Sequence, residues 1–282
     1  MKNRTSFLLS AVAGLSLAGC NDSSSSTESV DVELAQVISS QGLTGDPSLD
    51  RTLPDISDPG AQLGMELFFS KALGGDQDSA CVTCHHPALG GGDDLSLPIG
   101  VGADEPDLLG PGRTHGGSAL PTVPRNAPTT FNMALWDSAL FLDGRVESMS
   151  KEPGQNGATG DIRTPDSAFG SADALAGESL TVAQARFPVT SAEEMRGVTF
   201  EAGNGNEDVR THLAERLSGI RAGELVSPDN DASGLADWPE RFAAAYGNDE
   251  ITYAKIASAL AAYESSQVFV DTPWKAYVQG DT

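Results

Sequence analysis

The segment Cys81-Val82-Thr83-Cys84-His85 decides how this chain is interpreted, because it places two thiols and an imidazole within five residues. Two cysteines that are separated by two residues and followed directly by histidine form the attachment signature of c-type haem. The two thiols add to the two vinyl groups of one haem, and the histidine faces the iron as proximal ligand. The motif therefore predicts one covalent haem c, attached to Cys81 and Cys84, with His85 as an iron ligand.

Two other uses of a Cys-x-x-Cys pair fit this sequence less well. A structural zinc site needs about four ligands, and with three cysteines in the chain there is no second cysteine pair. A thioredoxin-like redox pair is expected between a strand and a helix, and the residues around Cys81 do not have that pattern.

The N-terminus has the pattern of an export signal. A basic start precedes an apolar stretch over residues 7–18, which is too short to span a bilayer comfortably. The stretch ends in Leu17-Ala18-Gly19-Cys20, which resembles a bacterial lipobox. We therefore expect residues 1–19 to be a lipoprotein signal peptide and Cys20 to carry lipid, with an ordinary secretory signal as the alternative. This predicts a periplasmic protein that meets the membrane only through a lipid anchor, in the compartment where bacteria attach haem c.

The chain is strongly acidic. Its formal net charge is −23, and loss of the two basic residues in the signal segment would bring it to about −25. Such a charge repels phosphates and argues against nucleic acid as a partner. It favours a basic partner protein, or solubility alone.

The rest of the chain is predicted to be mainly α, a cytochrome c-like haem domain with long Gly/Pro-rich loops. Residues 20–55 are expected to form a flexible polar tether, and residues 56–282 to form the haem domain. Apolar residues at helical spacing predict helices over 58–70, 206–220, 238–246 and 251–268. Long loops are predicted over 86–130 and 143–190, where glycine and proline are frequent.

The sixth iron ligand has a candidate in His115. His86 directly follows His85 and does not easily reach the opposite face of the haem. His115 lies in a glycine-rich loop that could reach it, although a surface position is the alternative. Without a side-chain ligand, the iron would keep an open position for a molecule such as peroxide.

Further segments lie in a recognisable order around the haem motif. They are Leu63-Gly64-Met65-Glu66-Leu67-Phe68-Phe69, Arg125-Asn126-Ala127-Pro128-Thr129, Asp143-Gly144-Arg145, Glu194-Met195, Ala259-Leu260-Ala261-Ala262-Tyr263-Glu264 and Asp271-Thr272-Pro273-Trp274. Together they resemble the bacterial di-haem cytochrome c peroxidase family, which includes the MauG proteins. The resemblance covers about residues 55–282. It implies a peroxidatic N-terminal haem domain and a C-terminal haem domain that receives electrons, whereas this sequence holds a single Cys-x-x-Cys-His motif.

The resemblance assigns roles to particular residues. Glu194 matches the acidic residue above the peroxidatic iron, which acts as general acid and base, although the segment from Ser191 to Glu194 also fits a helix capping box. Asn126 matches a residue that helps to bind calcium between the two haem domains. Arg145 is a candidate partner of a haem propionate, with a surface salt bridge as the alternative. Leu142 stands where the family often has tryptophan.

The resemblance implies reduction of hydrogen peroxide to water by electrons from a small redox protein, a cytochrome c or a cupredoxin. Three alternatives stay open. The chain could be an electron-transfer cytochrome c with a permanent sixth ligand, a MauG-like enzyme that oxidises side chains of a partner protein, or a haem-binding remnant without catalysis.

Overall fold

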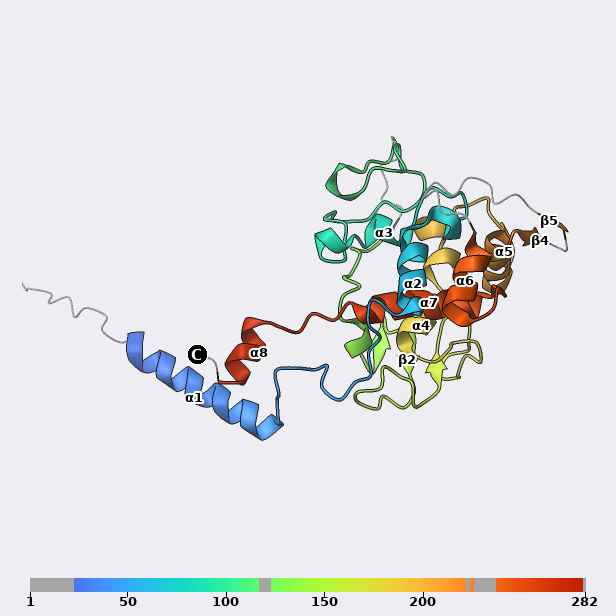
Figure 1. The fold of residues 1–282 in the computed structure, drawn as a ribbon. Coiled ribbons are helices and arrows are strands. Elements are labelled where there is room, and N and C mark those ends of the chain that lie inside the picture. The colour runs from blue at the N-terminus through green and yellow to red at the C-terminus, as the bar shows by residue number, and fades with distance from the viewer. Residues whose placement is uncertain (1–22, 117–122, 222–223, 226–236, 281–282) are drawn as a thin grey trace, which may run out of the picture. The chain divides into compact units, whose positions relative to one another are not determined.

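The computed structural model describes residues 23–116, 123–221, 224–225 and 237–280 (Figure 1). They belong to two compact units, which we treat separately. One combines the N-terminal residues up to Asp46 with the C-terminal residues from Asp271, and the other covers Pro47–Val270. The expected signal peptide and Cys20 lie outside the described residues, so the lipid anchor stays a prediction. No helix in the described part of the chain is long and apolar enough to cross a membrane.

The larger unit is mainly helical, as predicted. Its helices are α2 (Pro59–Phe69), α3 (Cys81–Cys84), α4 (Leu180–Gln184), α5 (Asn206–Ser218), α6 (Trp238–Tyr246) and α7 (Tyr253–Ser266). The four helices predicted from apolar spacing are all present, and each ends within two residues of the predicted position. Pro59 takes the first helical position of α2, but the carboxylate of Asp58 accepts from the Asp55 amide at 2.9 Å and makes no cap bond to the helix.

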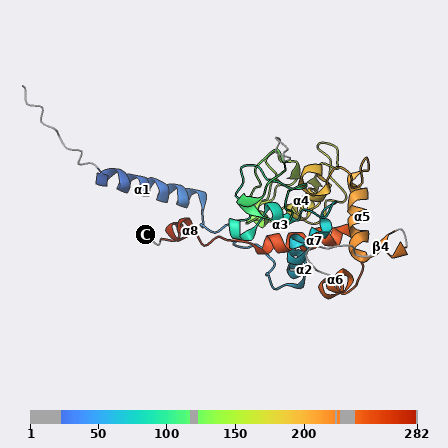
Figure 2. The same ribbon diagram turned by 90° about the horizontal axis from the view of Figure 1, so that it is seen from above.

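Helices α2 and α7 cross at close range and form the centre of the unit (Figures 1 and 2). The crossing requires Gly64, because a Cβ there would lie 1.8 Å from the Ala259 carbonyl oxygen. One turn along α2, the Phe68 ring packs edge-on against Tyr263 with 5.0 Å between ring centres. Helix α6 packs against α2 and α5 against α7, and together they enclose the main apolar core.

A second, smaller core lies in the segment predicted as a long loop over 143–190. Three short antiparallel strands pair in the order β1-β2-β3, namely β1 (Ala139–Leu140), β2 (Val146–Ser148) and β3 (Ile162–Arg163). Helix α4 packs on this sheet, and its Leu180 and Ala183 are fully buried there. Strands of two or three residues are too short to produce a periodic sequence signal, so the loop prediction missed them. A separate hairpin joins β4 (Ile220–Arg221) to β5 (Glu224–Leu225).

Two buried arginines tie the second core to α5. Arg186 Nη1 lies 2.6 Å from a carboxylate oxygen of Asp173, and Arg210 Nη1 lies 2.7 Å from one of Asp166. Both guanidinium groups also lie over the Phe187 ring. Because removal of one member would leave a buried charge without its partner, this cluster holds the segment in place.

The predicted loop over 86–130 is irregular in its described part, apart from single 3₁₀ turns at Pro87–Leu89 and Gly110–Gly112. Further 3₁₀ turns lie at Lys71–Leu73, Met133–Leu135 and Pro188–Thr190.

The smaller unit contains helical structure within the segment that is predicted to be a tether, and the role of that segment as a tether stays a prediction. Helix α1 covers Ser23–Gln41, and α8 covers Pro273–Val278. On α1, Leu34 and Ile38 are one turn apart and half-buried, a weak apolar stripe that the polar composition of the segment obscured. Within the smaller unit, an ion pair of 2.8 Å between Lys275 and Asp46 links its N-terminal segment to its C-terminal segment.

Candidate functional site

The two cysteines of the predicted haem motif lie on the single helical turn α3. Thr83 lies between them in the sequence, and its side chain is buried. Its hydroxyl accepts a hydrogen bond from the Ala80 amide at 2.9 Å, which fixes the start of the turn. Cys81 and Cys84 are unpaired and partly exposed. Protein nevertheless surrounds most of each sulfur, and this desolvation raises the pKa of both thiols, that of Cys84 to about 12.

His85 is held by one nitrogen only. Its Nδ1 lies 3.1 Å from the Gly91 carbonyl oxygen and 3.0 Å from that of Pro128, so this nitrogen is the donor. Burial lowers the pKa of His85, which keeps the ring neutral. A neutral imidazole that donates from Nδ1 to a carbonyl leaves Nε2 as a lone-pair ligand for a metal.

The residues present therefore fit a c-type haem. Two thiols on one turn and an oriented imidazole provide the donor set that such a haem requires. His86 is used otherwise, since its Nδ1 accepts from the Ala88 amide at 3.1 Å. His212 pairs with Glu201 at 2.5 Å.

Glu194 lies on a π turn over Ala192–Arg196. Burial raises the pKa of Glu194, while the positive charge of Arg145 acts in the opposite direction. The negative charge of Glu194 in turn raises the pKa of the thiols of Cys81 and Cys84, which places this carboxyl near both attachment residues.

The predicted capping box is only half formed. The Ser191 hydroxyl accepts from the Glu194 amide at 3.3 Å, but the Ser191 amide donates to Pro188 and not to the Glu194 side chain. The carboxyl of Glu194 is thus left for another role.

Main-chain contacts grip the Glu194 turn from two sides. The Gly75 amide donates to the Met195 carbonyl at 2.8 Å, and a Cβ on Gly75 would lie 1.8 Å from the Arg196 carbonyl oxygen. From the loop, Gly100 approaches so closely that a Cβ would lie 2.4 Å from the carbonyl oxygens of both Glu193 and Glu194. Only glycine leaves room for these approaches.

Arg113 fixes the loop that presses on this turn. Its side chain is buried, and it donates to Ile99 O at 2.7 Å and Gly100 O at 2.6 Å. It also donates to the carbonyl oxygens of Pro106 and Leu108, at 2.9 and 3.1 Å. The guanidinium group therefore holds two parts of the loop, residues 99–100 and 106–108, next to each other.

Arg145 forms the surface salt bridge that was one of its two predicted roles. Its Nη1 lies 3.2 Å from Asp143, and its guanidinium group lies 3.7 Å from the centre of the Phe141 ring. The adjacent Leu142 is 87% exposed, which is a high value for a large apolar side chain. Arg125, by comparison, is simply exposed.

His115 lies near the same loop. Its Nδ1 is enclosed and has no hydrogen-bond partner among the described residues, and a Cβ on Gly102 would lie 3.4 Å from its Nε2. Gly102 follows Gly100 by two residues, so His115 lies close to the segment that contacts the Glu194 turn. Its role as sixth ligand stays a prediction.

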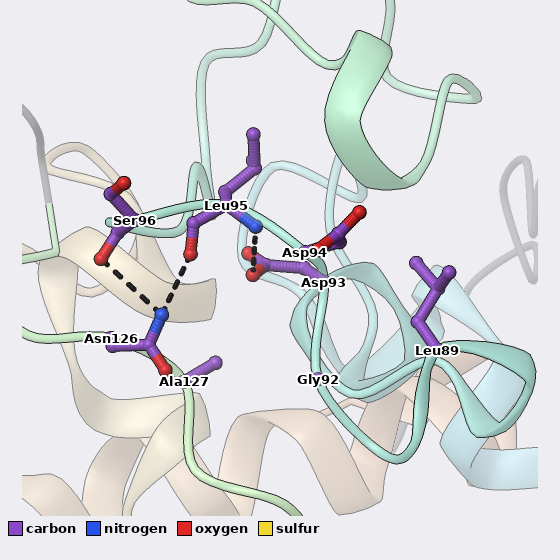
Figure 3. A pocket seen from close by; sticks show the side chains of 8 residues that line it. All are labelled: Leu89, Gly92, Asp93, Asp94, Leu95, Ser96, Asn126 and Ala127. Atoms are coloured by element: carbon purple, nitrogen blue, oxygen red, sulfur yellow. Dashed lines mark hydrogen bonds between the residues drawn. The ribbon is translucent and has the colours of Figure 1, made fainter. Parts of the chain in front are cut away.

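Asn126 lines a polar pocket of about 460 Å³ next to the His85 loop (Figure 3). Its amide nitrogen donates to Leu95 O at 2.7 Å and Ser96 O at 3.3 Å, and Asp93 accepts from the Leu95 amide at 3.1 Å. Within the described ranges, no three His, Cys, Asp or Glu side chains gather to hold a metal ion. The calcium role of Asn126 stays a prediction.

Arg113 and Glu264 are two residues of this region that were not singled out from the sequence. Arg113 is a single arginine in a loop, and no sequence signal marks it. Glu264 is a buried carboxyl on α7, and here a signal existed. It follows Ile256 and Leu260 at a spacing of four residues, so a charged residue stands on the apolar face of the helix.

The two cysteines on one turn and the oriented imidazole of His85 are the donor set typical of a c-type haem protein. A model of the di-haem cytochrome c peroxidase family matches residues 58–282. The chain belongs to that family, whose members include cytochrome c peroxidases and MauG proteins.

Known relatives are distant in sequence. The methylamine utilization protein MauG of Methylorubrum extorquens is 24% identical over 78% of this chain and 41% of its own length. The cytochrome c551 peroxidase of Nitrosomonas europaea is 22% identical over 78% of this chain and 43% of its own length. The cytochrome-c peroxidase IdrP1 of a Pseudomonas species is 34% identical over 32% of this chain and 19% of its own length. The chain thus spans less than half of the relatives that it matches.

Among solved structures, a MauG-like protein associated with microbial copper homeostasis is similar with a TM-score of 0.46 and 20% identity. The match covers 82% of this chain and 48% of that one.

Proposed function

We propose that this chain carries one haem c on Cys81 and Cys84 and reduces hydrogen peroxide to water with electrons from a small redox protein. The observation that carries the proposal is the position of Glu194. It is a carboxyl with a pKa raised by burial, it is held by main-chain contacts, and its charge acts on both haem-attachment cysteines. A general acid and base needs this combination of fixed geometry and a pKa moved toward neutrality.

The haem, when bound, would supply the redox chemistry of peroxide reduction. Glu194 would accept the proton of one peroxide oxygen and return it to the other oxygen, which then leaves as water. Two electrons and two further protons complete the conversion of one peroxide into two waters. His85 would present Nε2 to the iron, because its Nδ1 is held by Gly91 and Pro128.

The cytochrome c-like arrangement and the location belong to the same proposal. The close crossing of α2 and α7 at Gly64 supports a compact haem domain of that type. The lipobox-like sequence at Cys20 supports a periplasmic protein anchored by lipid. An electron donor would be a cytochrome c or a cupredoxin.

The test is the reaction of the haem-loaded protein with a stoichiometric amount of peroxide, followed by stopped-flow absorbance. Glu194→Gln keeps the shape of the side chain but removes its acid–base function, so the rate should fall by about 10²–10⁴-fold. The matched control is Glu193→Gln, since Glu193 is exposed and adjacent in sequence. A Glu194→Gln protein that reacts as fast as the wild type would refute the proposed role.

A second candidate is MauG-like oxidation of side chains in a partner protein. This chain is 24% identical to a MauG protein and 22% identical to a cytochrome c551 peroxidase. The two similarities therefore favour the MauG-like activity and the peroxidase activity equally. Reduced cytochrome c that is consumed in proportion to added peroxide would support the peroxidase. A peroxide-induced absorbance change that persists while reduced cytochrome c is not consumed would support the MauG-like activity. A low-spin spectrum that peroxide leaves unchanged would favour an electron carrier over both.

A further inference from the structure

Glu264 is a buried acid without a partner. It lies on α7 with 6% of its surface exposed, and its Oε2 has no hydrogen-bond partner among the described residues. Buried polar atoms are nearly always bonded, and leaving one unpaired costs about 1–3 kcal/mol. Such an atom at a fixed position therefore calls for a functional explanation.

The position of Glu264 is next to the haem-attachment turn. Cys81 packs against the apolar core to which α7 contributes Leu260 and Tyr263, and after burial the charge of Glu264 contributes most to raising the pKa of that thiol. The preceding residue, Tyr263, packs on Phe68, and the α2–α7 crossing at Gly64 allows no sliding of the helix. The carboxyl is thus held beside the place where the first thioether bond would form.

Among the residues that the structure describes, Glu264 forms no ion pair, and burial is the cause of its raised pKa. Helices α2, α4 and α5 and the turn Met133–Leu135 pack against α7. Their charged or titratable side chains, together with those of α7 and α3, are Glu66, Glu207, Asp208, Arg210, His212, Glu215, Arg216, Tyr253, Lys255, Tyr263, Cys81 and Cys84.

None of these groups shifts the pKa of Glu264, which burial alone raises to about 8. Glu66 is paired with Arg241 at 2.6 Å, and Lys255 lies 3.3 Å from Glu250. The two cysteines no longer titrate once they are thioethers. Glu264 is therefore a buried carboxyl near Cys81 whose charge can change near neutral pH.

We propose that Glu264 is a redox-linked proton acceptor of the haem pocket, whose carboxylate takes up one proton from solvent when the haem iron gains one electron. An added electron removes one positive charge near the carboxylate, so the protonated form becomes favoured. One electron and one proton enter together, and the net charge of the pocket is unchanged. Oxidation releases the proton. The inference rests on the proposed haem site at Cys81 and Cys84, but it does not require peroxide as substrate.

The test is a potentiometric titration of the full haem-loaded protein between pH 5.5 and 9, followed by absorbance. The oxidised haem lowers the pKa of the nearby acid relative to the reduced state. Between these two pKa values, the midpoint potential of the wild type should fall by up to about 59 mV per tenfold decrease in proton concentration. Glu264→Gln should lose this dependence, and Glu264→Asp, which retains a carboxyl, should keep it.

Glu194→Gln tests the other carboxyl near the cysteines, and Glu193→Gln, at an exposed position, is the control that should keep the slope. A wild-type potential that is independent of pH, or a slope retained in Glu264→Gln, would overturn the proposal. So would a slope that Glu194→Gln abolishes and Glu264→Gln leaves intact. If the Gln variant does not fold, proton uptake on photochemical reduction of the wild type decides, since uptake supports the proposal and its absence at pH 6, 7 and 8 refutes it.

Peroxide kinetics on the same samples separate this inference from the proposed function. Glu264→Gln should still react with peroxide. Loss of peroxide reactivity in every sample, wild type included, with the pH-dependent potential intact, would refute the peroxidase and leave the proton acceptor in place.

Discussion

Gly100→Ala is the most direct test of how the Glu194 turn is positioned. The new Cβ would lie 2.4 Å from the carbonyl oxygens of Glu193 and Glu194, at least about 0.6 Å closer than the 3.0 Å that real Cβ atoms keep. Arg113 donates a 2.6 Å hydrogen bond to the Gly100 carbonyl oxygen, and this bond opposes a movement of the loop away from the Glu194 turn. The turn must shift by about 0.6 Å or the loop must lose its anchor.

The size of the effect follows from this displacement. A misplacement of 1 Å can cost about 10²-fold in rate, so about 0.6 Å should slow the peroxide reaction by roughly tenfold. Overpacking of this kind also lowers the free energy of unfolding by about 1–3 kcal/mol.

Stopped-flow absorbance with peroxide and urea unfolding measure the two quantities on the same protein. Gly60→Ala is the control, because its Cβ would be 3.9 Å from Ala262 Cβ, an ordinary contact. A Gly100→Ala protein that is destabilised but reacts at the wild-type rate would show that this contact does not set the position of Glu194.

Three further outcomes concern stability, measured by urea unfolding. Although burial acts to raise it, hydrogen bonds from Arg51 and two amides lower the pKa of Asp137 to about 2, below the ordinary 3.8. The carboxylate therefore stabilises the fold by about 2 kcal/mol above about pH 4, and this stabilisation is lost as the pH falls toward 2. Asp137→Asn should flatten this dependence of the free energy of unfolding on pH. Arg113→Met leaves several buried carbonyl oxygens unpaired and should cost at least about 3 kcal/mol, whereas a change within about 0.5 kcal/mol would contradict the anchoring role. Arg210→Met should also cost about 3 kcal/mol, and adding Asp166→Asn should recover part of it if the buried pair is the cause.

The main helices could be predicted because their apolar faces repeat over several turns. Helices α2, α5, α6 and α7 each bury such a face, and the predicted ends differ by at most two residues. The small sheet β1-β2-β3 could not be predicted, since its strands span two or three residues and their pairing is set by distant contacts. Helix α1 was missed because its apolar stripe of Leu34 and Ile38 lies within a mostly polar sequence.

The site was predictable where chemistry fixes the sequence spacing. Cys81, Cys84 and His85 have the spacing that attachment of one haem c requires, so the sequence predicts their role. Glu194 was found through the family resemblance, and the structure adds its burial and main-chain support. Arg113 could not be found, because its five carbonyl partners are brought together only by the folded chain.

The main-chain grip on the Glu194 turn bears on how far such a sequence can diverge. At Gly75 and Gly100 the turn is held by amides and carbonyls, which every residue type possesses. Substitutions among the side chains around the turn therefore leave these contacts available, provided that the two glycines remain. A site built in this way can persist while most of the surrounding positions change. Sequence change around the Glu194 turn is then limited mainly at Gly75 and Gly100, where a side chain would collide with the main chain.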